Sequence, residues 1–203
     1  MKIRTCLGAL ALLIAVSAPA QQPKPGIVAE GGTPDDRASA RVLYWNTKKD
    51  AAAGQFAIDY GRPEWKIAYE DVAKFDGMTK GKVWRMGSNF WTTLDTSLPL
   101  KISGRDVPQG YYYLGLHRSA DGSSWSLAFF DPMEVRAADL DAYNVDKGRA
   151  RFEVPMTVAP AGGKTEKLTI TLSYPQDNIR KVALKVAWGT LALTAPIDVT
   201  VSE

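Results

Sequence analysis

The side chains best suited to hold a ligand gather in one stretch, residues 60–93. A guanidinium is a planar fork of donors that suits carboxylate or phosphate, an amide both donates and accepts, and an indole presents a flat apolar face to a sugar or an aromatic group. Glycines frame the stretch, where an ordinary sandwich strand would show plain alternation. The candidate ligand-binding residues of this stretch are Arg62, Trp84, Arg85, Asn89 and Trp91.

A structural interpretation of the same residues stays open. Trp84 and Trp91 would then be core or half-core aromatics, and Arg85 and Asn89 would tie a loop to backbone carbonyls. Structural networks gather polar groups as binding sites do. The sequence therefore predicts a candidate site without excluding a purely structural role.

The only histidine, His117, extends the candidate site. Strict alternation along a strand places His117 on the same face as Tyr111 and Tyr113, opposite Leu114 and Leu116. Histidine is the natural general base near neutral pH, so His117 and Tyr113 are added to the candidate ligand-binding residues. A strand-end or surface histidine without a function is the alternative.

A hydrolase is a further hypothesis. Its base would be His117 or a carboxylate such as Asp131. It requires a deep pocket in which at least two of His117, Asp131, Arg85 and Asn89 converge within hydrogen-bonding reach. No Gly-x-Ser-x-Gly sequence occurs, so a serine hydrolase of that type is not supported. No residue is assigned a catalytic role.

Metal sites and cofactors are not expected. One histidine and a single cysteine do not make the usual zinc ligand sets. Residues 139–146 hold oxygen ligands that suit calcium, but they lack the glycine and the terminal glutamate of an EF-hand loop. A solvated acidic loop is therefore the preferred interpretation.

The N-terminus has the pattern of a secretory signal peptide, residues 1–20. Lys2 and Arg4 precede a short apolar run, and Ala18 and Ala20 occupy the two small positions before Gln21. The apolar run is shorter than the roughly 20 residues of a membrane span, and no later run is long enough. We expect a protein exported to the periplasm or the cell exterior, with no transmembrane span after cleavage; an uncleaved anchor is the alternative.

Charge and cysteine content narrow the function classes of the mature chain. Loss of Cys6 with the signal peptide removes the only thiol, which excludes disulfides, Cys-ligated zinc and a cysteine nucleophile. Loss of Lys2 and Arg4 leaves 23 basic residues against 22 acidic ones, a net charge of +1. A nucleic-acid-binding protein commonly has a marked excess of basic residues, which this net charge does not show.

The rest of the chain predicts one all-β domain, residues 41–203, after a flexible leader rich in Pro and Gly, residues 21–40. Short runs with one apolar face, separated by turn residues, favour an antiparallel β-sandwich of jelly-roll-like type. A long irregular loop with at most one helical turn is expected over residues 64–80, and a short helix near residues 136–140. The expected strands cover residues 42–45, 56–60, 90–96, 98–102, 111–118, 124–130, 152–158, 168–174, 182–188 and 191–201.

Several short motifs give the chain a family resemblance. They are Tyr60-Gly61-Arg62-Pro63, the run Gly81-Lys82-Val83-Trp84-Arg85 with Gly87 and Asn89, Thr92-Thr93, the turn Pro108-x-Gly110-x-Tyr112, Trp125, and a weaker match at residues 142–146. With these motifs the chain resembles a bacterial exported family known as domain-of-unknown-function family 2911, over residues 40–200. The family pattern has an acidic and then a small residue after Asn89, where this chain has Phe90 and Trp91.

The resemblance implies an exported β-rich domain and assigns no activity. From the residues we expect a non-catalytic binding or envelope-associated module whose partner is a small molecule, a glycan, a peptide or an envelope protein. The hydrolase and the purely structural domain remain the alternatives.

Overall fold

The structure, a computed structural model, describes residues 28–29 and 35–202. Contacts divide the chain into two units, residues 1–34 and residues 35–203, and the strands and helices that the structure describes lie in the second. The expected signal peptide and most of the expected leader lie outside the described residues.

Within residues 35–202 the chain forms twelve strands and four short helices. The strands are β1 (Arg37–Asn46), β2 (Ala51–Gly61), β3 (Lys82–Trp84), β4 (Thr92–Thr96), β5 (Leu100–Ile102), β6 (Arg105–Val107), β7 (Gly110–Arg118), β8 (Trp125–Phe130), β9 (Phe152–Val158), β10 (Thr165–Ser173), β11 (Lys181–Gly189) and β12 (Leu191–Val199). The helices are the 3-10 helices η1 (Ile67–Tyr69) and η2 (Ala142–Lys147) and the α-helices α1 (Val72–Thr79) and α2 (Pro132–Ala137). The all-β fold class is confirmed.

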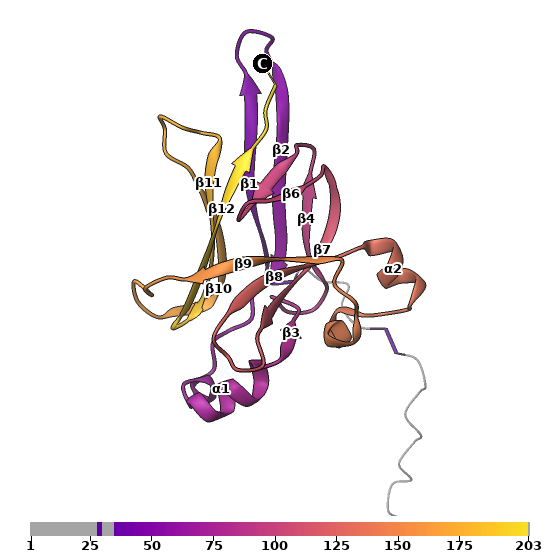
Figure 1. Cartoon of the computed structure of the whole chain (residues 1–203), viewed down its shortest axis with the longest axis vertical. Coiled ribbons are helices and arrows are strands. Elements are labelled where there is room, and N and C mark those ends of the chain that lie inside the picture. Colours follow the sequence, from indigo (N-terminus) through magenta and orange to yellow (C-terminus); the bar gives the residue numbers. More distant parts are fainter. Residues whose placement is uncertain (1–27, 30–34, 203) are drawn as a thin grey trace, which may run out of the picture. The chain divides into compact units, whose positions relative to one another are not determined.

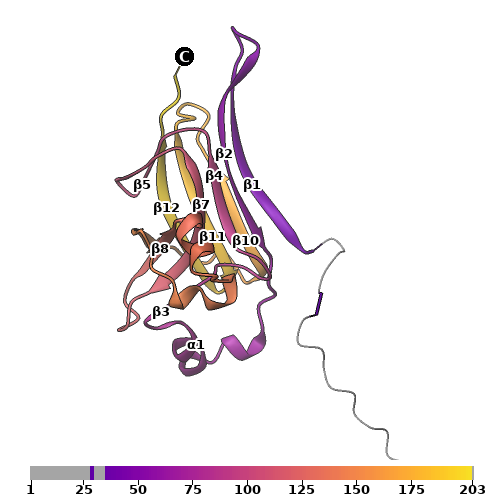
Figure 2. The same ribbon diagram turned by 90° about the vertical axis from the view of Figure 1, so that its right-hand side faces the viewer.

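The strands pair antiparallel in the order β1-β2-β4-β7-β8-β9-β12-β11-β10. Strand β9 connects two layers, because its residues 152–156 pair with β8 whereas Thr157 and Val158 pair with β12. Figure 1 shows β9 running crosswise between the layers, and Figure 2 shows strands of the two layers lying one behind the other. Beyond this path, β3 pairs with β7, and the β5–β6 hairpin pairs with β12.

The main core lies between the two layers and follows the two-residue period of the strands. In β11, for example, Val182, Leu184 and Val186 are buried between more exposed neighbours. The Tyr60 hydroxyl also joins the layers, since it donates to the Ile170 carbonyl at 3.3 Å and accepts from the Ile170 amide at 2.9 Å. The largest side chains buried there include Phe56, Ile58, Leu94, Leu114, Leu116, Leu127, Phe129, Leu168 and Leu184.

A smaller apolar cluster lies on the other side of the first layer. Here α2 and η2 cover part of the face that β4, β7 and β8 turn away from the main core, which we call the outer face. Val135 of α2 and Val145 of η2 pack with Trp91, Ala128 and Phe130. Figure 1 shows α2 beside β7. This second cluster fixes the position of Trp91.

Several boundaries differ from the sequence-based expectation. Strand β1 already begins at Arg37, before the expected domain start at residue 41. Residues 64–80 are more regular than expected, because they contain η1 and a complete helix α1 that begins after the N-cap Asp71. Helix α2 begins before the helix expected near residue 136, since the Asp131 carboxylate accepts from the Met133 amide and Pro132 suits the first helical position.

Two strands were not expected from the sequence. Strands β3 and β6 have three residues each, too short to show an alternating pattern. Among the described residues, no helix combines the length and apolar character needed to cross a membrane.

Candidate functional site

The structure places the seven sequence-predicted site residues in four separate environments. Arg62 lies at the end of β2, Trp84 in the main core, Arg85 with Asn89 in a turn, and Trp91, Tyr113 and His117 on the outer face. Trp84 and Arg85 line one surface hollow between β3 and η2, whereas the fold separates Arg62 and the outer-face residues from them.

Arg62 connects β2 to the opposite layer. Its Nε donates to the Leu168 carbonyl at 3.3 Å, and its Nη1 lies 4.0 Å from the Asp36 carboxylate. A backbone hydrogen bond joins the same two segments in the opposite direction, from the Leu168 amide to the Pro63 carbonyl at 3.0 Å. The Arg62 guanidinium therefore serves a contact between layers.

Trp84 is a half-buried aromatic of the main core. Its indole stacks on Trp188 of β11, with ring centres 4.8 Å apart and planes inclined by 16°. The residue also lines, together with Arg85, a surface hollow of about 450 Å³ between β3 and η2. Trp84 thus fits the structural interpretation better than the ligand-binding one.

Arg85 and Asn89 belong to a tight turn between β3 and β4. Arg85 Nε donates to the Gly87 carbonyl at 3.2 Å, and Arg85 Nη1 donates to the Asn89 carbonyl at 3.3 Å. Asn89 has a φ of +64° and Met86 a φ of +52°, in the left-handed region. Asparagine tolerates this region better than most residues, so Asn89 suits the turn by conformation. Two nitrogens of the Arg85 guanidinium thus bond to backbone carbonyls, and the group also lies 5.6 Å from the ring centre of Tyr143.

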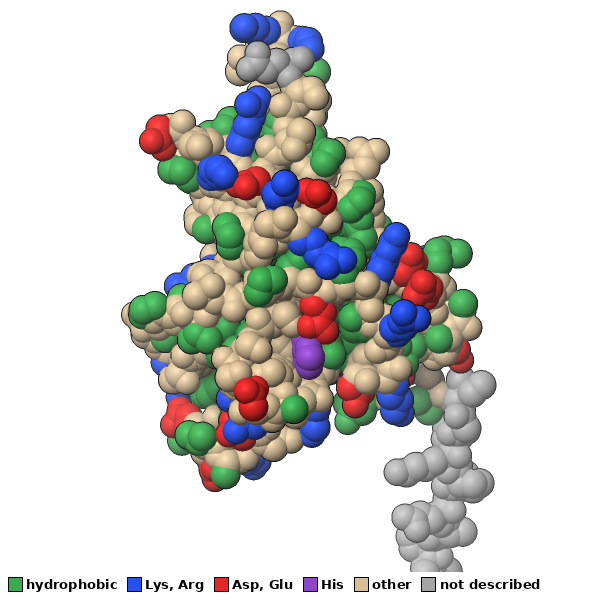
Figure 3. Space-filling model, in the orientation of Figure 1, with side chains coloured by type: hydrophobic (Ala, Val, Ile, Leu, Met, Phe, Trp, Pro, Cys, Tyr) green, Lys and Arg blue, Asp and Glu red, His purple; other side chains and the backbone are tan. Residues whose placement is uncertain are grey.

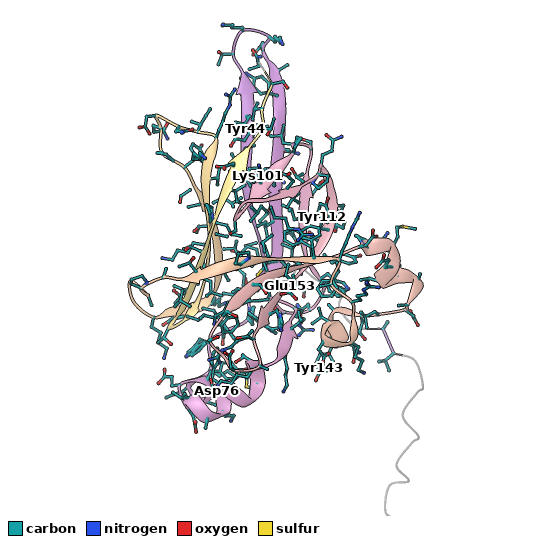
Figure 4. The ribbon with its side chains drawn as sticks, in the orientation of Figure 1. Tyr44, Asp76, Lys101, Tyr112, Tyr143 and Glu153 are labelled. Atoms are coloured by element: carbon teal, nitrogen blue, oxygen red, sulfur yellow. The ribbon has the colours of Figure 1, made fainter. Side chains whose placement is uncertain are left out.

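His117 lies on the outer face, as alternation predicts, while Leu114 and Leu116 are buried. Its Nδ1 is 2.9 Å from Oε2 of Glu153, which also accepts a short hydrogen bond from Ser126. In Figure 3 the histidine lies at the surface beside an acidic side chain, and Figure 4 labels Glu153 in the same orientation. Burial opposes ionisation of Glu153, but the bonds from Ser126 and His117 outweigh it and hold its pKa below the ordinary value.

The residues named for a hydrolase do not converge. His117 bonds to Glu153, whereas Asp131 caps α2 and lies 3.4 Å from Arg151. Ser126 donates to Glu153 and not to His117, and among the described residues no hydroxyl group hydrogen-bonds to the His117 ring. Among the described residues, no side chain of His117, Asp131, Arg85 or Asn89 hydrogen-bonds to another of the four.

Trp91 and Tyr113 do come together, in a groove on the outer face of β1, β2, β4 and β7. This outer-face groove has a volume of about 530 Å³. Strand register arranges its residues in two rows across the sheet. The first row is Ser39, Asp59, Thr93 and Tyr113, and the second is Arg41, Ala57, Asp95 and Tyr111.

One wall of the outer-face groove is aromatic. Trp91 stacks on Tyr113, with ring centres 4.8 Å apart and planes inclined by 14°, and Tyr111 meets Tyr113 edge-on at 5.9 Å. Trp91 is nearly buried, whereas Phe90 is 69% and Tyr111 46% exposed. Phe90 and Tyr111 are therefore the aromatic side chains of the groove that are most open to a ligand.

The opposite side of the groove is polar and firmly positioned. Arg37 Nε donates to Asp59 Oδ1 at 2.9 Å, Arg37 Nη2 makes a second, short bond to the same oxygen, and Nη2 also reaches the Trp91 carbonyl at 3.2 Å. These bonds tie β1, β2 and the segment before β4 together. Arg41 and Asp95 lie exposed along the groove.

The groove residues that the sequence-based prediction missed include Arg37, Arg41, Asp59, Phe90, Asp95 and Tyr111. Alternation within each strand would place Arg41, Asp59 and Asp95 on an outer face. It does not reveal that β4 lies between β2 and β7 while β3 pairs farther along β7. In residues 28–29 and 35–202, no group of three or more His, Cys, Asp and Glu residues is arranged to hold a metal ion.

The fold and the groove define an antiparallel β-protein with an open, aromatic-lined groove on one sheet face. Residues 45–197 match the family described as "Protein of unknown function (DUF2911)", and the chain belongs to this family. No curated protein and no solved structure shows significant similarity to the chain.

Proposed function

We propose that the protein is a non-catalytic oligosaccharide-binding module and that the outer-face groove holds the sugar chain. The observation that carries this proposal is the pairing of two exposed aromatic side chains, Phe90 and Tyr111, with charged side chains across a shallow groove. A sugar ring has an apolar C–H face that packs on an aromatic ring, and hydroxyl groups that both donate and accept.

The rigidity of the groove supports binding. Stacking on Trp91 fixes Tyr113, and three hydrogen bonds fix Arg37. A ligand loses less affinity when the groups that contact it are already ordered.

A glycan fits this groove better than a peptide does. Extended peptides usually add a strand to a free sheet edge, where backbone groups are unpaired. The outer-face groove instead lies on the face of β1, β2, β4 and β7, of which β2, β4 and β7 are paired on both sides and β1, the end strand, is paired with β2 alone. The face of these strands presents side chains, which suits a ligand recognised through rings and hydroxyl groups.

Binding without cleavage is proposed because glycosidases commonly need two carboxyl groups with separate roles. Asp59, one of two carboxylates that line the groove, is already bonded twice to Arg37. Release of shorter products from a bound oligosaccharide would contradict this part of the proposal and favour an enzyme.

The experiment is a binding screen by isothermal titration calorimetry with hexasaccharides of glucose, N-acetylglucosamine, xylose and mannose. We expect at least one to bind, and Tyr111→Ala and Phe90→Ala each to weaken binding about three- to tenfold, the value of one aromatic contact. Tyr143→Ala is the matched control, because Tyr143 is 79% exposed on η2, outside the groove (Figure 4). Absence of binding to the whole panel, or a Tyr111→Ala variant that binds like the parent, would overturn the proposal.

Export to the periplasm or the cell exterior forms part of this proposal, because polymeric glycans occur in these compartments. It is supported by the sequence pattern of residues 1–20. N-terminal sequencing of the protein recovered from fractionated bacterial cells tests it. A mature N-terminus at Gln21 in the exported fraction is expected, and an unprocessed chain retained in the cytoplasm would contradict it.

A further inference from the structure

A second hollow adjoins the outer-face groove on the other side of Tyr111. Its volume is about 590 Å³, and Tyr111 lines both hollows. We call the second hollow the arginine pocket, because Arg136 of α2 and Arg151 before β9 lie in its wall. A chain-like ligand in the groove that continues past Tyr111 would enter this pocket.

The arginine pocket has an excess of positive charge. Of the described residues that line it, Asp131 is the only carboxylate beside the two arginines. Asp131 is already engaged, since its carboxylate accepts from the Met133 amide at 2.8 Å as the cap of α2. Its contact with Arg151 is long, at 3.4 Å. The pocket thus has more guanidinium groups than carboxylates to pair them.

The two guanidinium groups are accessible. Arg151 has 59% of its side chain exposed. Arg136 is exposed and forms no ion pair with any described carboxylate; Nη2 donates to the Tyr113 hydroxyl at 3.3 Å. The bond from Arg136 to Tyr113 connects this pocket to the aromatic wall of the groove. A ligand carboxylate would meet fork-shaped donors that suit its geometry.

We infer that the arginine pocket is a subsite for an acidic sugar unit, so that the preferred ligand is an oligosaccharide that carries uronate carboxylates. This inference rests on the proposed function, because the outer-face groove holds the remainder of the same chain. Tyr111 stands between the neutral part and the acidic part of the ligand.

The test compares each acidic oligosaccharide with a neutral copy of itself. Hexamers of galacturonate, mannuronate and glucuronate are titrated against the protein in low salt, beside counterparts whose carboxyl groups have been reduced to alcohols. We expect at least one acidic hexamer to bind about tenfold more tightly than its reduced counterpart, as a charge-assisted hydrogen-bond pair predicts. This preference should shrink when salt is raised to about 0.3 M, because salt screens exposed charges.

Single substitutions test whether the preference for acidic hexamers arises in the arginine pocket. Arg151→Gln and Arg136→Gln should each lower the ratio of acidic to neutral affinity toward one. Arg180→Gln removes an exposed arginine at a different end of the protein, beside the C-terminal segment, and should leave the ratio unchanged. Equal melting temperatures of parent and variants establish that folding is retained.

The outcomes separate the two proposals. Binding of neutral and acidic hexamers with equal affinity would overturn the acidic subsite and leave the oligosaccharide-binding proposal standing. A preference that persists in both Arg136→Gln and Arg151→Gln would also overturn the subsite. Absence of binding to any acidic or neutral hexamer would overturn both.

Discussion

Trp84 of β3 lies parallel to Trp188 of β11, with 4.8 Å between ring centres. Trp91, only a few residues further along the chain, stacks instead on Tyr113 of the outer face. The two tryptophans therefore belong to different apolar clusters on opposite faces of one layer. Mutations at Trp84 should affect stability, and mutations along the outer-face groove should affect binding.

Trp84→Ala should lower the free energy of unfolding by about 2–4 kcal/mol, since it removes the stack on Trp188 and leaves a cavity at the edge of the main core. Urea unfolding followed by circular dichroism measures the change. Trp45→Ala is the matched control, because Trp45 is 52% exposed, and we expect a change within about 0.5 kcal/mol. Equal losses in the two variants would show that the Trp84 stack carries no stability.

Asn89 should be replaceable by glycine but not by alanine. Its φ of +64° costs a residue with a Cβ atom about 1–2 kcal/mol, a cost that glycine avoids and asparagine partly avoids. We expect Asn89→Ala to lower the thermal midpoint, whereas Asn89→Gly should match the parent. If both variants melt alike, the conformation of the turn does not explain the asparagine.

Gly189→Ala should be among the most damaging single substitutions in the described part of the chain. Gly189 joins β11 to β12 with a φ of +58°, and a Cβ atom there would lie 2.0 Å from the Trp65 ring. Gly104, with a φ of +84°, has open space around the same position and gives the matched control. Gly104→Ala should cost about 1 kcal/mol, and Gly189→Ala several times more. Chemical denaturation of both variants compares the losses, and equal losses would exclude a steric role of Trp65.

Asp121 should give the β7–β8 hairpin a pH-dependent contribution. Hydrogen bonds from the Ser119 hydroxyl and from the Ser123 amide and hydroxyl lower the pKa of Asp121 from 3.8 to about 2. Because the folded-state pKa is the lower one, the stabilisation is complete above about pH 4 and disappears as the pH falls through about 2.

The unfolding free energies of the parent and Asp121→Asn should therefore differ at pH 5 and converge near pH 2. Ser119→Ala removes the strongest donor to Asp121 and should shift the convergence to higher pH. A difference between parent and Asp121→Asn that stays constant over this range would contradict the assignment.

Much of the fold could be predicted from the sequence because strand patterns are local. Alternation placed Leu114 and Leu116 in the core and His117 outside it, as the structure has them. The Asp121-Gly122 pair, with Gly122 at a φ of +80°, marks the hairpin between β7 and β8. The family resemblance, found from short motifs, was confirmed over residues 45–197.

The tertiary structure alone decided which side chains share a surface. Alternation assigns a residue to a face of its own strand, but it does not choose the neighbouring strand or the register. Arg41, Asp95 and Tyr111 are far apart in sequence and lie in one row only because β4 pairs with both β2 and β7. Trp84 and Trp91 are close in sequence but lie apart in the fold. The reason is that β3 and β4 pair with different parts of β7. Strand pairing brings together residues that are distant in sequence. The set of side chains that lines the groove therefore depends on long-range contacts, which a local sequence pattern does not encode.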